Sequence, residues 1–251
     1  MVTDALQDIW DRMTTAGAAP SGLLLALTAG VAFVVVAWRP AWGVARHGIT
    51  IVHEASHALA ALVSGRSLSG IRLHSDTSGL TVSRGKPRGP GMVLTAFAGY
   101  VGPALLGLGA AALVGQRYAA GLLWALVVVL ALMLVQIRNW FGLWSVLVSG
   151  VALVAVSWWG SDVVVTVAAY LVTFVLLLGA PRAVVELQSE RRRRRTGTSD
   201  ADMLARLTPF PGMFWVVVFL AVTLGCLALG GWWIASDALG EGWWGELTAG
   251  L

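Results

Sequence analysis

The stretch VARHGITIVHEASHALAALVS, residues 44–64, decides the fold of this chain. It is apolar over roughly the length of a bilayer span, yet it contains His53, Glu54 and His57 within five positions. In a helix, residues four apart share one face, so the two histidines can offer imidazole nitrogens to one metal ion. Ionisable side chains inside a membrane are costly unless they serve a function, which favours a metal site over residues that are merely satisfied by polar neighbours.

The spacing of these three residues is typical of zinc chemistry. Zinc binds neutral histidine, keeps one position open for water in catalytic sites, and lowers the pKa of that water. A neighbouring carboxylate can then take a proton from the water, and this is the role we expect for Glu54. Because catalytic zinc usually has three protein ligands, a third ligand must come from elsewhere in the chain.

The composition indicates a membrane protein. Of the 251 residues, 57 % are hydrophobic and only 12 % are charged, which is too apolar for a soluble globular domain. The length suits one helical bundle, so we expect a single integral membrane domain over residues 1–251. The net charge of +4 does not indicate nucleic-acid binding, because the basic residues fall between apolar runs.

Apolar runs of bilayer length predict seven transmembrane helices. They cover residues 22–38, 44–64, 91–114, 119–137, 141–159, 163–180 and 213–234, with a basic loop at residues 181–211. Between the second and third runs, residues 71–74 and 80–83 flank Asp76-Thr77-Ser78-Gly79, which is the pattern of a β-hairpin. We therefore expect an all-α integral membrane protein, a polytopic bundle of about seven helices with a membrane-associated β-hairpin after the motif helix.

The basic residues predict the orientation of this bundle. If the run Arg191 to Arg195 is cytoplasmic, alternation of seven spans places 14 of the 17 basic residues on that side. Arg12 falls on the same side, and only Arg39, Arg46 and Arg117 fall on the other. The interpretation is a multi-pass protein of the cell membrane with a cytoplasmic amino terminus, whose HEASH motif lies in the cytoplasmic half of the bilayer.

Polar residues on the predicted cytoplasmic side could complete the site. Asn139 could ligate zinc weakly or hydrogen-bond a substrate, or it could be a helix cap. Asp200 and Asp202 could supply the third ligand, but an N-cap of a short helix at Ser199 or Asp200 is the better explanation of this segment. Asp76 is a further candidate, with a turn role as the better explanation. The hairpin could be an ordinary loop or a substrate clamp, since an edge strand can hold an extended peptide through backbone hydrogen bonds.

Four features together resemble the site-2 protease family of intramembrane zinc metalloproteases. They are the HEASH motif in a membrane helix, the polar hairpin after it, the glycine-rich span with Gly99-Tyr100-Val101-Gly102-Pro103, and Arg138-Asn139. The resemblance covers about Val44 to Gly150. It implies that His53 and His57 bind Zn²⁺ and that Glu54 is the general base. From the residues alone, the small side chains of the glycine-rich span predict close helix packing or a kink.

The chain departs from the family pattern after Asn139, which resembles the residue that opens the family's second motif. That motif normally continues through proline to an Asp-Gly whose aspartate is the third zinc ligand. Here Asn139 is followed by residues 140–143, Trp-Phe-Gly-Leu, which contain no aspartate. Either Asp200 or Asp202 replaces it, or the site is altered. No PDZ-like insertion is evident, so the chain resembles a compact branch of the family.

The resemblance implies regulated intramembrane proteolysis, the hydrolysis of peptide bonds in or near transmembrane segments of other membrane proteins. The expected partners are such a substrate and the lipid bilayer. The missing aspartate leaves open a catalytically inactive zinc-binding pseudoprotease that acts as a scaffold for membrane proteins. A transporter is a third possibility, because transporters also carry intramembrane charges, but here the charges cluster on one helix and no inverted repeat is evident.

Overall fold

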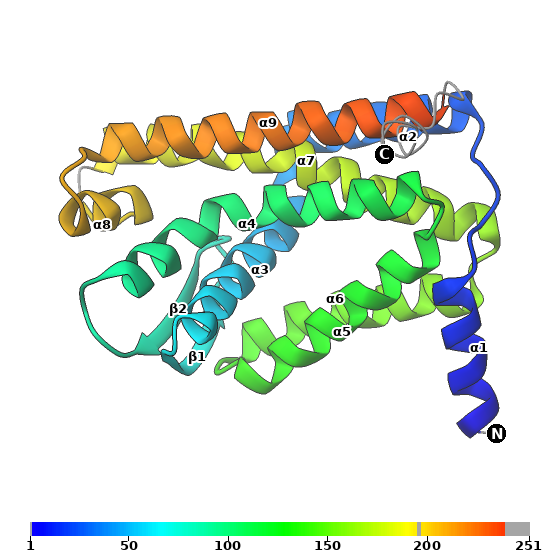
Figure 1. Ribbon diagram of the computed structural model, residues 1–251, viewed down its shortest axis with the longest axis horizontal. Coiled ribbons are helices and arrows are strands. Elements are labelled where there is room, and N and C mark those ends of the chain that lie inside the picture. The colour runs from blue at the N-terminus through cyan, green and yellow to red at the C-terminus, as the bar shows by residue number, and fades with distance from the viewer. Residues whose placement is uncertain (1, 195–196, 239–251) are drawn as a thin grey trace, which may run out of the picture.

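Helices form most of the computed structural model, which describes residues 2–194 and 197–238 (Figure 1). Arg195, the last of the arginine run, therefore lies outside the described residues. The elements are α1 (Val2–Thr14), α2 (Gly22–Ala37), α3 (Arg39–Val63), β1 (Ser67–Leu73), β2 (Gly79–Arg84), α4 (Pro90–Gly115), α5 (Ala119–Gln136), α6 (Trp140–Trp159), α7 (Asp162–Arg194), α8 (Asp200–Leu207) and α9 (Gly212–Ala238). Helices α4, α5, α6, α7 and α9 are long and apolar enough to cross a membrane. The predicted all-α polytopic membrane protein is confirmed.

The first two predicted spans form a bent pair. Helices α2 and α3 meet at Trp38, whose backbone is extended, and their axes differ by 96°. Pro40 lies in the first turn of α3, where its missing N–H costs no hydrogen bond, so the sequence favours a new helix at this point. Helix α2 packs on α7, whereas α3 turns away and packs on α4. The described residues thus contain five spans, or six if the bent pair counts as one, instead of the seven predicted.

The bent pair changes the predicted position of the amino-terminal helix. Figure 1 shows α1 at the end of the bundle opposite to the hairpin. There the Gly17 N–H donates to the Arg117 carbonyl at 2.9 Å, and the Arg12 guanidinium donates to the Ser157 carbonyl at 3.4 Å. The sequence interpretation placed Arg12 and Arg117 at opposite ends. It was wrong on this point, and the 96° bend between α2 and α3, which it counted as two full crossings, gives the reason.

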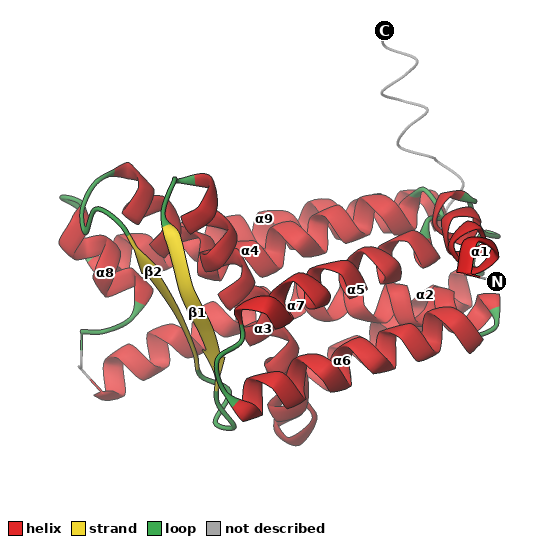
Figure 2. Ribbon diagram, turned by 90° about the horizontal axis from the view of Figure 1, so that it is seen from below, coloured by secondary structure: helices red, strands yellow, loops and turns green. Residues whose placement is uncertain are grey.

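The predicted hairpin is confirmed. Strands β1 and β2 pair antiparallel, with Leu73 opposite Gly79 and Ser67 opposite Arg84. The other edge of β1 is also occupied, because Ile71 forms a parallel bridge with Ile137 just after α5. Strand β2 packs against α3, and Figure 2 shows the hairpin at the same end of the molecule as α8. The hairpin therefore connects the motif helix to the end of α5.

The predicted basic loop at residues 181–211 is mostly helical. Helix α7 continues through Pro181 to Arg194, and α8 follows before α9 begins. Helix α8 is amphipathic, and its Ala201 and Leu204 are fully buried in a cluster with residues of α4 and α9, among them Phe219. This apolar contact places the start of α8 close to the motif helix.

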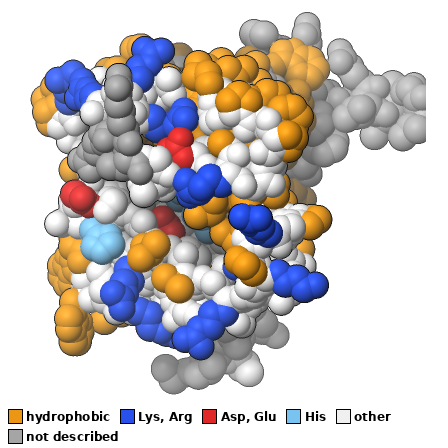
Figure 3. All heavy atoms as spheres, turned by 90° about the vertical axis from the view of Figure 1, so that its left-hand side faces the viewer, with side chains coloured by type: hydrophobic (Ala, Val, Ile, Leu, Met, Phe, Trp, Pro, Cys, Tyr) orange, Lys and Arg blue, Asp and Glu red, His pale blue; other side chains and the backbone are white. Residues whose placement is uncertain are grey.

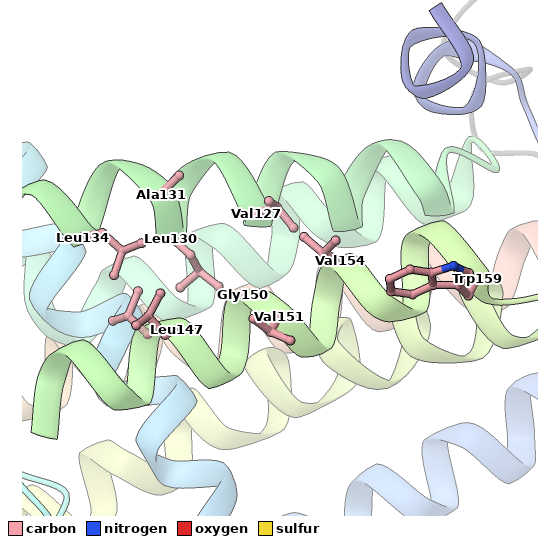
Figure 4. Close-up of a pocket in the computed structure, with 10 residues that line it drawn as sticks. Val127, Leu130, Ala131, Leu134, Leu147, Gly150, Val151, Val154 and Trp159 are labelled. Carbon is pink, nitrogen blue, oxygen red and sulfur yellow. The ribbon is translucent and has the colours of Figure 1, made fainter. Parts of the chain in front are cut away.

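A second feature of the bundle is an apolar pocket between α5 and α6 (Figure 4). It has a volume of about 280 Å³ and extends from Leu134 and Leu147 to Trp159. Helix α6 is the least buried of the five candidate spans, so this side of the bundle is suited to contact lipid. The pocket contains none of the motif residues.

Candidate metal centre

Two segments far apart in the sequence bring three metal-ligating atoms together. His53 and His57 lie one turn apart on α3, and their Nε2 atoms are 3.0 Å from each other. Asp200, the first residue of α8, places Oδ2 3.3 Å from Nε2 of His53 and 3.2 Å from Nε2 of His57. Among the described residues, these three side chains form a group that could hold a metal ion. Asp200 thus joins the histidine pair that the motif predicted.

A carbonyl of α4 fixes the orientation of one imidazole. The Nδ1 atom of His57 lies 2.6 Å from the Thr95 carbonyl oxygen, which can only accept a hydrogen bond, so Nδ1 carries the proton. The Nε2 atom, which faces His53 and Asp200, is then free to ligate a metal. Metal-binding histidines generally use their second nitrogen in this way. Nothing in the sequence near Thr95 pointed to this role.

Glycines allow α4 to approach the motif helix closely, as the small residues of this span predicted. A Cβ atom at Gly99 would overlap the rings of both His53 and His57, and one at Gly102 would overlap the side chain of Ser56. Next to Gly99, the Tyr100 ring lies edge-on to the His53 ring with the centroids 4.7 Å apart. Helix α4 therefore forms one wall of the candidate metal centre.

The hairpin forms the opposite wall and holds Glu54. The Thr81 hydroxyl of β2 donates to Oε2 of Glu54 at 2.6 Å, and the Glu54 side chain is buried. A Cβ atom at Gly79 would overlap the same carboxylate, so the start of β2 lies directly against it. Thr81 stood in the alternating pattern that predicted the strand, but its contact with Glu54 depends on how the hairpin folds back onto α3.

A polar cleft leads to these side chains. Its volume is about 290 Å³, and its lining includes His53, Glu54, Gly79, Tyr100 and Asp200. Figure 3 shows the corresponding end of the molecule, where Lys and Arg side chains surround a region with acidic and histidine side chains. A polar ligand can therefore reach the carboxylate and the candidate metal ligands from this end.

Asn139 lies elsewhere and pairs with the hairpin backbone. Its Nδ2 donates to the Leu73 carbonyl at 2.6 Å, and its Oδ1 accepts from the Leu73 N–H at 3.2 Å. The amide side chain thus imitates a neighbouring strand at the end of β1. The residue also stands at the N-terminus of α6, but it makes no capping bond to that helix through its side chain.

The two remaining aspartates also have partners of their own. Oδ1 of Asp202 accepts hydrogen bonds from Arg191, and Asp76 in the hairpin turn accepts from Ser78. The Ser78 hydrogen bonds lower the pKa of the Asp76 carboxyl below its ordinary value. The structure therefore brings Asp200, and neither of the other two aspartates, to the histidine pair.

Both aspartates of α8 are held in the ionised form. Burial by itself would raise the pKa of Asp200, but the adjacent His57 and His53 outweigh it and lower that pKa. Burial likewise opposes ionisation of Asp202, and the hydrogen bonds from Arg191 and Ser199 lower its pKa below the ordinary value. An ionised carboxylate is the form in which an aspartate binds a metal ion.

Comparison with known proteins gives one match. No curated protein and no solved structure matches the chain significantly. A family model described as Peptidase M50B-like matches residues 26–230, a segment that includes the motif helix, the hairpin and Asp200. The matched segment covers most of the 251 residues. The chain therefore belongs to the peptidase M50B-like family, and its resemblance to the site-2 proteases is confirmed.

Proposed function

We propose that the protein is an intramembrane zinc metalloprotease that hydrolyses peptide bonds in or near transmembrane segments of other proteins. The observation that supports the proposal is that the ligand atoms of Asp200, His53 and His57 lie close together. It supplies a third ligand from α8 in a chain whose Asn139 motif lacks the usual aspartate. Family membership supports a membrane metalloprotease independently of this geometry.

The ligand separations suit zinc. With metal–ligand bonds of about 2.0–2.1 Å, tetrahedral angles place ligand atoms about 3.3 Å apart. The three Nε2 and Oδ2 atoms are separated by 3.0, 3.2 and 3.3 Å. Two neutral imidazoles and one carboxylate form a donor set that zinc accepts, and three protein ligands leave a fourth position for water.

Glu54 is the proposed general base. Zinc held by His53, His57 and Asp200 would supply a Lewis acid that polarises the substrate carbonyl and lowers the pKa of the attacking water. Glu54 takes a proton from that water and later delivers it to the leaving nitrogen of the cleaved peptide. Thr81 keeps the carboxylate in place for both transfers through its 2.6 Å hydrogen bond.

The hairpin is the proposed substrate clamp. One edge of β1 is covered by residues 137–139, but the outer edge of β2 has no strand partner among the described elements. Gly79, at the start of β2, lines the cleft beside Glu54. A locally unwound substrate that adds to this edge would gain backbone hydrogen bonds close to the proposed base.

The proposed location is the cell membrane, with the hairpin and α8 at the cytoplasmic end. Basic residues surround this end of the molecule, as the positive-inside rule requires. The amino terminus then faces the other side, because α1 lies at the opposite end. This reverses the orientation that the sequence predicted for the amino terminus, while most of the basic residues stay inside.

The direct test measures metal content and cleavage on the purified protein in detergent. We expect one zinc per chain in the parent, loss of zinc in His53→Ala and Asp200→Ala, and zinc that is still bound but with a raised Kd in Asp202→Ala. Glu54→Gln should keep zinc and lose cleavage of a transmembrane peptide. A well-folded parent without zinc contradicts the proposal. Stoichiometric zinc without cleavage of any membrane peptide would instead support the zinc-binding scaffold.

A further inference from the structure

The candidate ligand Asp200 stands on a short element. Helix α8 has eight residues, and Asp200 is the first of them. A ligand atom is held only as firmly as the helix that carries it. Two sets of contacts fix α8 to the bundle. One is apolar and consists of the buried Ala201 and Leu204, and the other is polar and centres on Asp202.

Asp202 connects the first turn of α8 to α7. One carboxylate oxygen, Oδ1, accepts from Nη2 of Arg191 at 2.8 Å and from Nε at 3.1 Å. The other oxygen, Oδ2, accepts from the Ser199 N–H at 3.3 Å, and the Asp202 N–H donates back to Ser199 Oγ at 3.3 Å. This capping box orders the turn internally, whereas the ion pair with Arg191 connects the turn to α7.

Arg191 is itself held in a fixed place. Its Nη1 donates to Oε1 of Gln188 at 2.9 Å, one turn earlier on α7. At the start of α9, Gly212 leaves room for the guanidinium, because a Cβ atom there would overlap Nη2. The Arg191 and Asp202 side chains are only 19 % and 20 % exposed. Arg191 thus links the ends of α7, α8 and α9 at one point.

We propose that Arg191 and Asp202 are positioning residues of the metal centre, which set Oδ2 of Asp200 against the Nε2 atoms of His53 and His57. This inference rests on the proposed function, in which those three residues bind zinc. Neither partner of the pair contacts the histidines in the described structure, so the effect acts through the placement of α8. Metal sites need their ligands within about 0.5 Å of the productive geometry, so a small displacement of α8 weakens binding.

The experiment compares zinc affinity and the visible absorption of bound Co²⁺ in the full-length protein. The variants are Arg191→Gln, Asp202→Asn and the double variant. We expect each single change to raise the zinc Kd about 10-fold, as changes to groups that support metal ligands generally do. The cobalt bands should also change, because they report ligand number and geometry. Since the pair acts as one unit, the double variant should bind no more weakly than the weaker single variant.

Two further variants serve as controls. Arg192→Gln removes the same charge at the adjacent, exposed position and should keep the parent Kd and spectrum. Arg191→Lys keeps the charge but lacks the planar guanidinium, so we expect a zinc Kd between those of the parent and Arg191→Gln. If Arg191→Gln does not fold, Arg191→Lys and Asp202→Asn replace it in the test. A parent without zinc overturns the proposed function. If the parent binds zinc and the single variants keep its zinc Kd and its cobalt spectrum, only the role of the Arg191–Asp202 pair is overturned.

Discussion

Gly99 leaves the space in which the two histidine rings meet, because a Cβ atom there would overlap both of them. We expect Gly99→Ala to displace the rings and to lose most of the bound zinc. Gly109→Ala is the matched control, since a Cβ at this position of the same helix meets no atom within 4 Å. Zinc content measured by elemental analysis distinguishes the two variants. Equal zinc in Gly99→Ala and the parent would show that the rings can lie elsewhere.

Thr81 is the second residue with a testable role. Thr81→Val keeps the side-chain shape but removes the 2.6 Å hydrogen bond to Glu54. A hydrogen bond to a charged group contributes about 1.5–3 kcal/mol, so we expect kcat for a membrane peptide to fall at least 10-fold while zinc stays bound. The reverse exchange at the adjacent exposed position, Val82→Thr, should leave kcat unchanged. An unaltered kcat in Thr81→Val would mean that Glu54 does not depend on the hairpin.

At the scale of elements, Asn139 tests how the hairpin is held. Its amide makes two hydrogen bonds to the Leu73 backbone at the end of β1. We expect Asn139→Ala to loosen the hairpin, so that amides of β1 and β2 exchange hydrogen faster in deuterated buffer, with cleavage reduced. Zinc content should stay at the parent value, because the side chain pairs with a strand. Loss of zinc would restore the prediction that Asn139 is a ligand.

For the whole molecule, the bent pair predicts which positions share a side of the membrane. Thr15 follows α1, and Arg88 follows the hairpin; both are exposed. Cys226 is first replaced by serine, and a single cysteine is then placed at position 15 or at position 88. The two variants should react with a membrane-impermeant thiol reagent from opposite sides of sealed vesicles. Labelling of both from the same side would support the seven-span arrangement. A third variant, Arg117→Cys, should be labelled from the same side as the cysteine at position 15, because the Gly17 N–H donates to the Arg117 carbonyl.

Sequence was most informative where the determining contacts are local. The spacing of His53 and His57 fixes their common face within one turn, and apolar length alone locates most span boundaries within a few residues. The identity of the third candidate ligand needed tertiary information, since Asp200 and Asp202 both lie in the first turn of α8 and only the docking of α8 turns one of them toward the histidines. An apolar run gives the length of a helix but not the angle between its axis and that of the next helix. Hydropathy therefore missed the bend at Trp38, even though Pro40 marks a helix start.

The distance along the chain between the ligands has a consequence for biosynthesis. The histidines belong to α3, whereas Asp200 follows α7 and is made only after about four-fifths of the 251 residues. Until the ribosome has translated that segment and α8 has docked, the growing polypeptide holds an incomplete ligand set. Under the proposed function, the translocon and neighbouring nascent helices are therefore not exposed to a competent hydrolase while this chain is still being inserted.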